Sequence, residues 1–118
     1  MAQKYIVNDI VMYKNRIHTI IDILASNGYE LSYVRHQVSP VRLSGVPLTP
    51  EILEKNGWRE EKGDYINDNY HIRLCEKIDS YSAYKVVNDT IVWLRDIESV
   101  SDLQHLFFGL NLNSEMEV

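Results

Sequence analysis

The sequence predicts an α+β fold, either a curled antiparallel sheet or a small β-barrel, with one short central helix and a C-terminal helix. Three observations predict it. Short segments rich in β-branched and aromatic residues follow one another between turn residues. A proline-bearing stretch interrupts them mid-chain, and the apolar spacing changes to three or four residues near the end. The length of 118 residues fits a single domain over residues 1–118.

The first half is predicted to form three strands joined by tight turns. Only Lys14 and Asn15 separate the segments 5–13 and 16–24, and asparagine tolerates the positive φ of a two-residue hairpin loop. A turn at 26–28 leads to a third strand over 29–35, which would place Tyr33 and Arg35 on one face. Such a meander is the start of a small barrel. The second strand is expected to carry one face formed by Ile17, Thr19, Ile21 and Ile23.

The stretch "GVPLTPEILEKNGW", residues 45–58, predicts a short capped helix. Thr49 suits the N-cap, Pro50 suits the first helical position, and Gly57 suits the left-handed residue that ends a helix. Isolated helices shorter than about 12 residues are marginal in water. This helix is therefore expected to dock on a core through Leu53 and Trp58.

The second half returns to strands and closes with a helix. Strands are expected within 58–67, 70–78, 81–87 and 90–97. A helix follows within 98–110, where Ser99 and Asp102 have the spacing of a capping box. The polar residues 111–118 are expected to form a frayed tail.

The charge is unevenly distributed along the chain. The net charge is −5, yet residues 1–50 carry five basic and three acidic residues, a net charge of +2. Residues 51–118 carry seven basic and fourteen acidic residues, a net charge of −7. A dominant basic face, as in proteins that bind duplex nucleic acid, is therefore not expected. A small basic site in the first half is compatible with these numbers.

Several site classes have no support in the sequence. Cys75 is the single cysteine, which excludes an internal disulfide and a multi-cysteine zinc site, and it is expected to be a buried, inert thiol. No signal peptide or membrane-spanning run is visible, so an intracellular protein is expected. No catalytic triad, metal site or cofactor motif is predicted.

The best candidate ligand site is formed by Tyr33, Arg35, His36 and Arg42. Arginines bind phosphate through two parallel hydrogen bonds, and a tyrosine ring can stack on a base. The alternative is a set of ordinary surface charges. On the last helix, Leu106 and Phe108 are surplus to a single apolar stripe and are candidates for a homo-oligomer or partner contact. A helix buried all round explains them equally well.

Three stretches together resemble a family of short, mostly uncharacterised proteins encoded by Bacteroidetes phages and prophages. They are "NDIVMYKNRIHTI", "GVPLTPEILEKNGW" and "VSDLQHLFFGL", in that order. The family's last motif often has histidine where this chain has Ser101. The resemblance implies an accessory protein acting in the cytoplasm of a bacterial host.

These observations favour a non-enzymatic binding module over a catalyst. It would counteract host defence by sequestering a phosphorylated small molecule, such as a signalling nucleotide, or by binding a host protein. The alternatives are a small nucleotide hydrolase and a structural or virion-associated protein.

Overall fold

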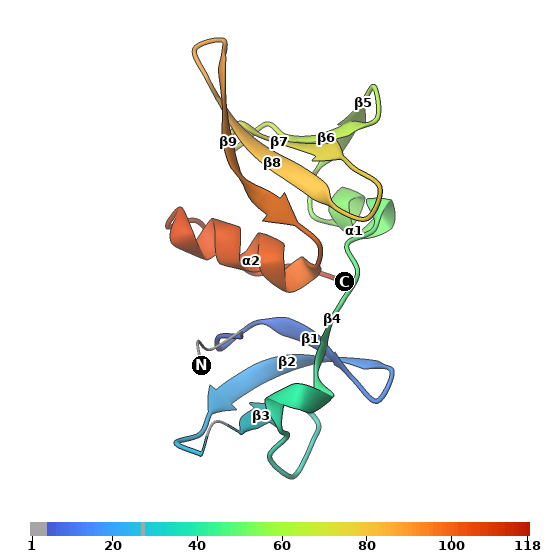
Figure 1. The fold of residues 1–118 in the computed structure, drawn as a ribbon, viewed down its shortest axis with the longest axis vertical. Coiled ribbons are helices and arrows are strands. Elements are labelled where there is room, and N and C mark those ends of the chain that lie inside the picture. Colours follow the sequence, from blue (N-terminus) through green and yellow to red (C-terminus); the bar gives the residue numbers. More distant parts are fainter. Residues whose placement is uncertain (1–4, 27) are drawn as a thin grey trace. The chain divides into compact units, whose positions relative to one another are not determined.

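The computed structural model describes residues 5–26 and 28–118 and has an α+β fold with two antiparallel sheets (Figure 1). The chain divides into two compact units, unit 1 over residues 1–46 and unit 2 over residues 47–118. The α+β class is confirmed. The single curled sheet or small barrel is wrong, because the strands form two separate sheets and no pairing among the described residues closes either one. The single domain over residues 1–118 stays a prediction.

Unit 1 is a small sheet with the strand order β3-β2-β1-β4. The first two strands form the predicted hairpin, and the φ angles of Lys14 and Asn15 are 49° and 63°, as its two-residue loop requires. The predicted turn at 26–28 includes Asn27, which lies outside the described residues. The elements are β1 (Ile10–Tyr13), β2 (Arg16–Ile23), β3 (Tyr29–Leu31), the 3₁₀ helix η1 (Pro40–Arg42) and β4 (Ser44–Gly45).

The alternation of Ile17, Thr19, Ile21 and Ile23 does not mark the buried face along the whole of β2. Ile20 is fully buried with Val11 and Leu31, whereas Ile17 and Ile21 are 45% and 53% exposed. Apolar residues occupy both positions 20 and 21, so the alternation alone does not select a face. The pairing of β2 with β1 and β3, which shifts register after Ile20, selects it.

The third strand is shorter than predicted, and Tyr33 and Arg35 do not share a strand face. β3 ends at Leu31, and a turn follows in which the Val34 N–H donates to the Leu31 carbonyl oxygen at 3.3 Å. Within this turn Tyr33 has a φ of 62°, which is incompatible with a strand. Tyr33 and Arg35 therefore lie in a loop.

Unit 2 is a five-stranded meander with the order β5-β6-β7-β8-β9, and α2 lies against one face of it (Figure 1). No described helix is long and apolar enough to cross a membrane. The elements are α1 (Pro50–Lys55), β5 (Arg59–Glu61), β6 (Asp64–Asn67), β7 (Ile72–Glu76), β8 (Tyr81–Val87), β9 (Thr90–Ile97) and α2 (Val100–Gly109).

The short central helix is confirmed. The Thr49 side chain accepts a hydrogen bond from the Ile52 N–H at 3.3 Å, and Gly57 ends the helix with a φ of 86°. Leu53 is fully buried and Trp58 is 4% exposed, and the Trp58 ring stacks on Phe107 of α2 with 6.1 Å between centroids. Docking on the unit 2 core therefore holds α1, as its length requires.

The C-terminal helix is also confirmed, with Ser99 and Asp102 forming the capping box. The expected frayed tail has no regular secondary structure, but several of its residues are tied to the helices. The Asn56 side chain donates to the Glu117 carbonyl oxygen at 2.8 Å and accepts from the Glu117 N–H at 2.9 Å. The Gln104 side chain donates to the Ser114 carbonyl oxygen at 3.3 Å.

Replacing Leu53 with alanine should lower the free energy of unfolding of unit 2 by about 2–5 kcal/mol, the usual cost of truncating a buried leucine. Both tryptophans lie in this unit, so tryptophan fluorescence in a urea titration reports its unfolding. Glu54→Ala, on the exposed side of the same helix, is the control and should change it by less than about 0.5 kcal/mol. Equal effects of the two variants would contradict docking through Leu53.

Candidate functional site

Unit 1 carries a shallow, open hollow of about 340 Å³ next to the β1–β2 hairpin. This size is at the lower end for ligand pockets, which span about 300–1,000 Å³. We call it the basic hollow, and its lining residues are Tyr13, Lys14, Arg16, His18, Tyr33, Val34, Arg35 and His36. Three of the four predicted ligand-binding residues, Tyr33, Arg35 and His36, are therefore brought together. The fourth, Arg42, lies on η1 and is not part of the lining.

The β1–β2 hairpin supplies one wall of the basic hollow. Tyr13 lies opposite Arg16, and Val11 lies opposite His18. Side chains alternate between the faces of a strand, so these two pairs lie on the same face. The tight turn at Lys14 and Asn15 thus places Tyr13, Arg16 and His18 side by side.

The loop Ser32–Gln37 supplies the other wall and is fixed at both ends. At its start, the Ser32 N–H donates to the Thr19 carbonyl oxygen and the Thr19 N–H donates to Ser32 Oγ, both at 3.0 Å. Just after its end, Val38 and Tyr29 exchange two backbone hydrogen bonds of 2.8 Å. Binding residues are often carried by loops on a rigid scaffold, and this loop has that form.

Tyr13 lines the basic hollow and contacts both of its histidines. Its ring makes edge contacts with His18 and His36 at centroid distances of 5.9 and 6.5 Å, and its hydroxyl is 3.4 Å from His36 Nε2. His18 Nδ1 is 2.8 Å from the Ser32 carbonyl oxygen, which can only accept, so Nδ1 carries the proton. The Lys14 ammonium lies 5.4 Å from the Tyr13 ring centroid.

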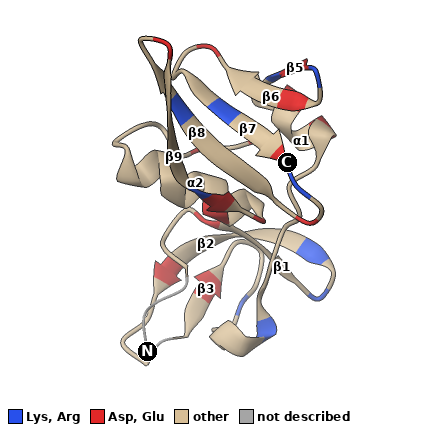
Figure 2. Ribbon diagram, turned by 45° about the horizontal axis from the view of Figure 1, so that its top comes forward, with Lys and Arg blue, Asp and Glu red and all other residues tan. Residues whose placement is uncertain are grey.

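No carboxylate lines the basic hollow. Lys14, Arg16 and Arg35 are exposed, and among the described residues none of them forms an ion pair. Figure 2 shows the basic segment at the β1–β2 hairpin. Three cations without a carboxylate partner can donate charge-assisted hydrogen bonds to an anion, and the open geometry lets it approach from solvent.

Tyr33 is held in a strained conformation. A left-handed backbone costs an L-amino acid other than glycine roughly 1–2 kcal/mol, and bulky residues rarely adopt it. The Tyr33 side chain is nonetheless 100% exposed, so burial of the ring does not offset this cost. The turn between the two fixed ends of the loop imposes the conformation, and strain of this kind clusters at ligand sites.

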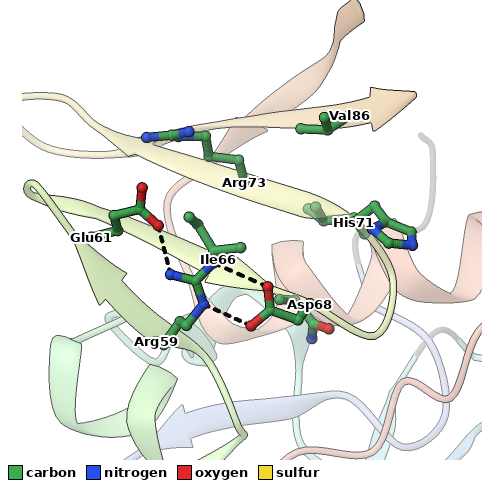
Figure 3. A pocket seen from close by; sticks show the side chains of 9 residues that line it. Arg59, Glu61, Ile66, Asp68, His71, Arg73 and Val86 are labelled. Atoms are coloured by element: carbon green, nitrogen blue, oxygen red, sulfur yellow. Dashed lines mark hydrogen bonds and ion pairs between the residues drawn. The ribbon is translucent and has the colours of Figure 1, made fainter. Parts of the chain in front are cut away.

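A second charged hollow, in unit 2, contrasts with the first because its two arginines are already paired. Figure 3 shows the Arg59 part of this network. Arg59 donates to Glu61 at 2.6 Å and to Asp68 at 2.7 Å, and Arg73 pairs with Asp64 at 2.9 Å. These hydrogen bonds from Arg59 hold the pKa values of Glu61 and Asp68 below their usual range. Because both arginines are already bound to carboxylates, neither is available to bind an added anion.

Two further expectations concern Cys75 and metal ions. Cys75, expected to be buried, is only half-buried. Desolvation, the largest cause, raises the pKa of its thiol, so the thiol stays protonated near neutral pH. Within residues 5–26 and 28–118, no three potential metal-ligating side chains gather into a site.

The two predicted interface residues on α2 differ in exposure. Phe108 is 65% exposed and remains a candidate for a contact, whereas Leu106 is only 8% exposed and offers little surface. A larger exposed apolar group lies on the β8–β9 hairpin, which sequence reasoning did not single out. Its members, between 46% and 56% exposed, are Val87, Ile91, Val92 and Trp93.

Sequence reasoning missed the hairpin half of the basic hollow. The two-residue turn at Lys14 and Asn15 was the available signal, because it makes Tyr13 and Arg16 cross-strand neighbours. The contact of this hairpin with the loop Ser32–Gln37 depends on pairing between β2 and β3, which local sequence does not specify.

Comparison with protein-family models, curated proteins and solved structures found no match. The resemblance to the phage family therefore stays a prediction.

The Arg59 network makes the stability of unit 2 depend on pH. The pKa values of Glu61 and Asp68 are lowered from 4.5 and 3.8 by folding, so the stabilisation is complete above these values and is lost as the pH falls below them. Arg59→Gln should therefore lower the melting temperature more at pH 7 than at pH 3, with tryptophan fluorescence as the readout. Lys55→Gln, which removes an unpaired charge, is the control. An Arg59→Gln effect that is equal at both pH values would contradict this assignment.

Proposed function

We propose that unit 1 binds a phosphorylated small molecule in the basic hollow, and that the protein acts as a non-enzymatic binding module. One observation carries the proposal: Lys14, Arg16 and Arg35 all line one hollow, and no carboxylate lines it. Phosphate groups suit such a site because their oxygens accept several hydrogen bonds and arginine can donate two in parallel.

The distribution of charge supports the same proposal. Unit 1 has a net charge of +2 and unit 2 a net charge of −7, so the boundary between the units coincides with the change of sign. In unit 2, ion pairs engage Arg59, Arg73, Lys77 and Arg95. Lys14, Arg16 and Arg35, which line the basic hollow of unit 1, are unpaired among the described residues. Unit 1 also carries fewer carboxylates that would repel a phosphate.

The biological role we propose is sequestration of a host phosphorylated compound in the bacterial cytoplasm, as an accessory function of a phage or prophage. This part of the proposal rests on the resemblance of the three sequence stretches to the phage family.

Calorimetry with pyrophosphate at low salt tests the phosphate site. Arg16→Ala and Arg35→Ala should each weaken binding about tenfold or more, since a hydrogen bond to a charged group contributes about 1.5–3 kcal/mol. Arg42→Ala removes the same charge from unit 1 outside the lining and should leave the affinity within about twofold, apart from long-range effects that salt screens. Melting temperatures should barely change.

Equal losses in all three variants would indicate general charge attraction and contradict a site at the basic hollow. Recovery of intact pyrophosphate and nucleotides after denaturation would support a binding module, whereas chromatographic detection of their hydrolysis products would favour the hydrolase alternative.

A second candidate function, association of two copies of the chain, is favoured by the edge strand β9. Val86 of β8 lies opposite Ile91 of β9. The Val86 N–H donates to the His71 carbonyl oxygen at 2.8 Å, so this N–H points away from β9. Hydrogen bonding alternates along an antiparallel pair, so the backbone groups of Ile91 and Trp93 point outward from the sheet edge. These groups form a template for another strand.

The outward groups fit a second copy of β9 in antiparallel orientation. A two-fold axis at Val92 sets Ile91 of each copy opposite Trp93 of the other, which gives two hydrogen-bonded pairs. The Trp93 and Ile91 side chains would then meet on one face, and the two Val92 side chains on the other. All three are about half exposed in the single chain.

Native mass spectrometry tests this pairing. The unaltered chain should form dimers, and Val92→Lys should reduce them because two ammonium groups would face each other across the two-fold axis. Phe108→Lys, at an exposed apolar position on α2, is the control. Loss of the dimer in Phe108→Lys but not in Val92→Lys would move the contact to α2, and a monomer at all concentrations would reject both surfaces.

A further inference from the structure

We infer that the ligand of the basic hollow is a nucleotide with at least two phosphate groups, whose base stacks on Tyr33 while its phosphates lie on Lys14, Arg16 and Arg35. This inference rests on the proposed phosphate-binding function and names the class of ligand.

Tyr33 differs from every other tyrosine of the chain. The other seven are buried or half-buried, whereas Tyr33 is 100% exposed. Among the described residues its ring contacts no other ring. Both faces of an aromatic ring are thus open at the border of a cationic hollow, and such a ring can stack on any nucleobase.

The loop holds this ring ready for a ligand. Tyr33 is the third residue of the turn closed by Val34 and Leu31, and Ser32 ties the same turn to Thr19. The backbone position of Tyr33 is therefore already set, and a ligand would order little more than its side chain. Preorganisation of this kind raises affinity because less conformational freedom is lost on binding.

The amount of charge indicates more than one phosphate. Lys14, Arg16 and Arg35 carry three permanent positive charges, and His18 and His36 add two ionisable groups to the same lining. A single phosphate group at neutral pH brings a charge of about −1.5 to −2. Two adjacent phosphates match the three cations more closely. The Tyr33 ring can thus bind a base, and the cations beside it match two phosphates. A nucleoside diphosphate carries both of these groups.

Inorganic phosphate and sugar phosphates would use only part of this site. They would meet the cations but leave the Tyr33 ring in water. The strained φ of 62° is also unnecessary for binding phosphate alone, since Lys14 and Arg16 come from the hairpin and Arg35 follows the turn. A ligand that covers the ring accounts for all of these features together.

The test is calorimetry of the full chain with ADP, GDP, UDP, ribose 5-phosphate and pyrophosphate under one salt condition. At least one nucleoside diphosphate should bind roughly tenfold more tightly than pyrophosphate, the size expected for one base on an aromatic side chain. Ribose 5-phosphate should bind more weakly than pyrophosphate.

Variants at position 33 locate the effect. Tyr33→Phe keeps the ring and should keep the preference for the nucleotide. Tyr33→Leu removes the aromatic surface and should abolish that preference, so that nucleoside diphosphates and pyrophosphate bind this variant with similar affinity. Tyr33→Gly relieves the positive φ, should melt no lower than the unaltered chain, and should lose the preference to the same extent. The Gly variant decides the result if the Leu variant does not fold.

The outcomes separate the two proposals. Nucleoside diphosphates that bind no more tightly than pyrophosphate would overturn the base-stacking inference and leave the phosphate site standing. A preference that survives in Tyr33→Gly would also overturn it. Absence of binding for every compound, pyrophosphate included, would overturn the proposed function itself.

Discussion

The basic hollow depends on the hydrogen bonds that tie the loop Ser32–Gln37 to the strands beneath it. Two bonds join Ser32 to Thr19, and two more join Val38 to Tyr29. Fixing the backbone of a residue costs about 1–2 kcal/mol of conformational entropy, so a free loop would have to be ordered by its ligand. Here folding has already ordered it, with Tyr33, Arg35 and His36 at fixed backbone positions.

The same ordering explains how unit 1 supports a strained residue. The pairing of β2 with β1 and β3 buries Val11, Ile20, Tyr29 and Leu31. The stabilisation from burying this core outweighs the cost of the left-handed backbone at Tyr33. The turn at Tyr33 is thus imposed by its surroundings. A strained, solvent-exposed aromatic residue beside unpaired cations is more readily understood as part of a binding surface than as a contribution to stability.

The two units use their cations in opposite ways. In unit 2, arginines such as Arg59 and Arg73 are engaged by carboxylates on neighbouring strands. Exposed ion pairs contribute little to stability, about 0–1 kcal/mol each, but they leave no free partner for an external anion. In unit 1 the cations at the hairpin and the loop have no such partner among the residues that the structure describes. The gathering of three unpaired cations in the lining of one hollow distinguishes the candidate site from the rest of the described surface.

The sequence by itself determined the features that depend on neighbours in the chain. The turn at Lys14 and Asn15, the cap at Thr49 and the capping box of Ser99 follow from local backbone preferences, and the structure has all three. Only the tertiary structure decided which face of β2 is buried and where β3 ends. It also decided that the hairpin and the loop meet in one basic hollow. These outcomes depend on strand pairing between residues distant in sequence, and alternation of apolar residues does not specify that register.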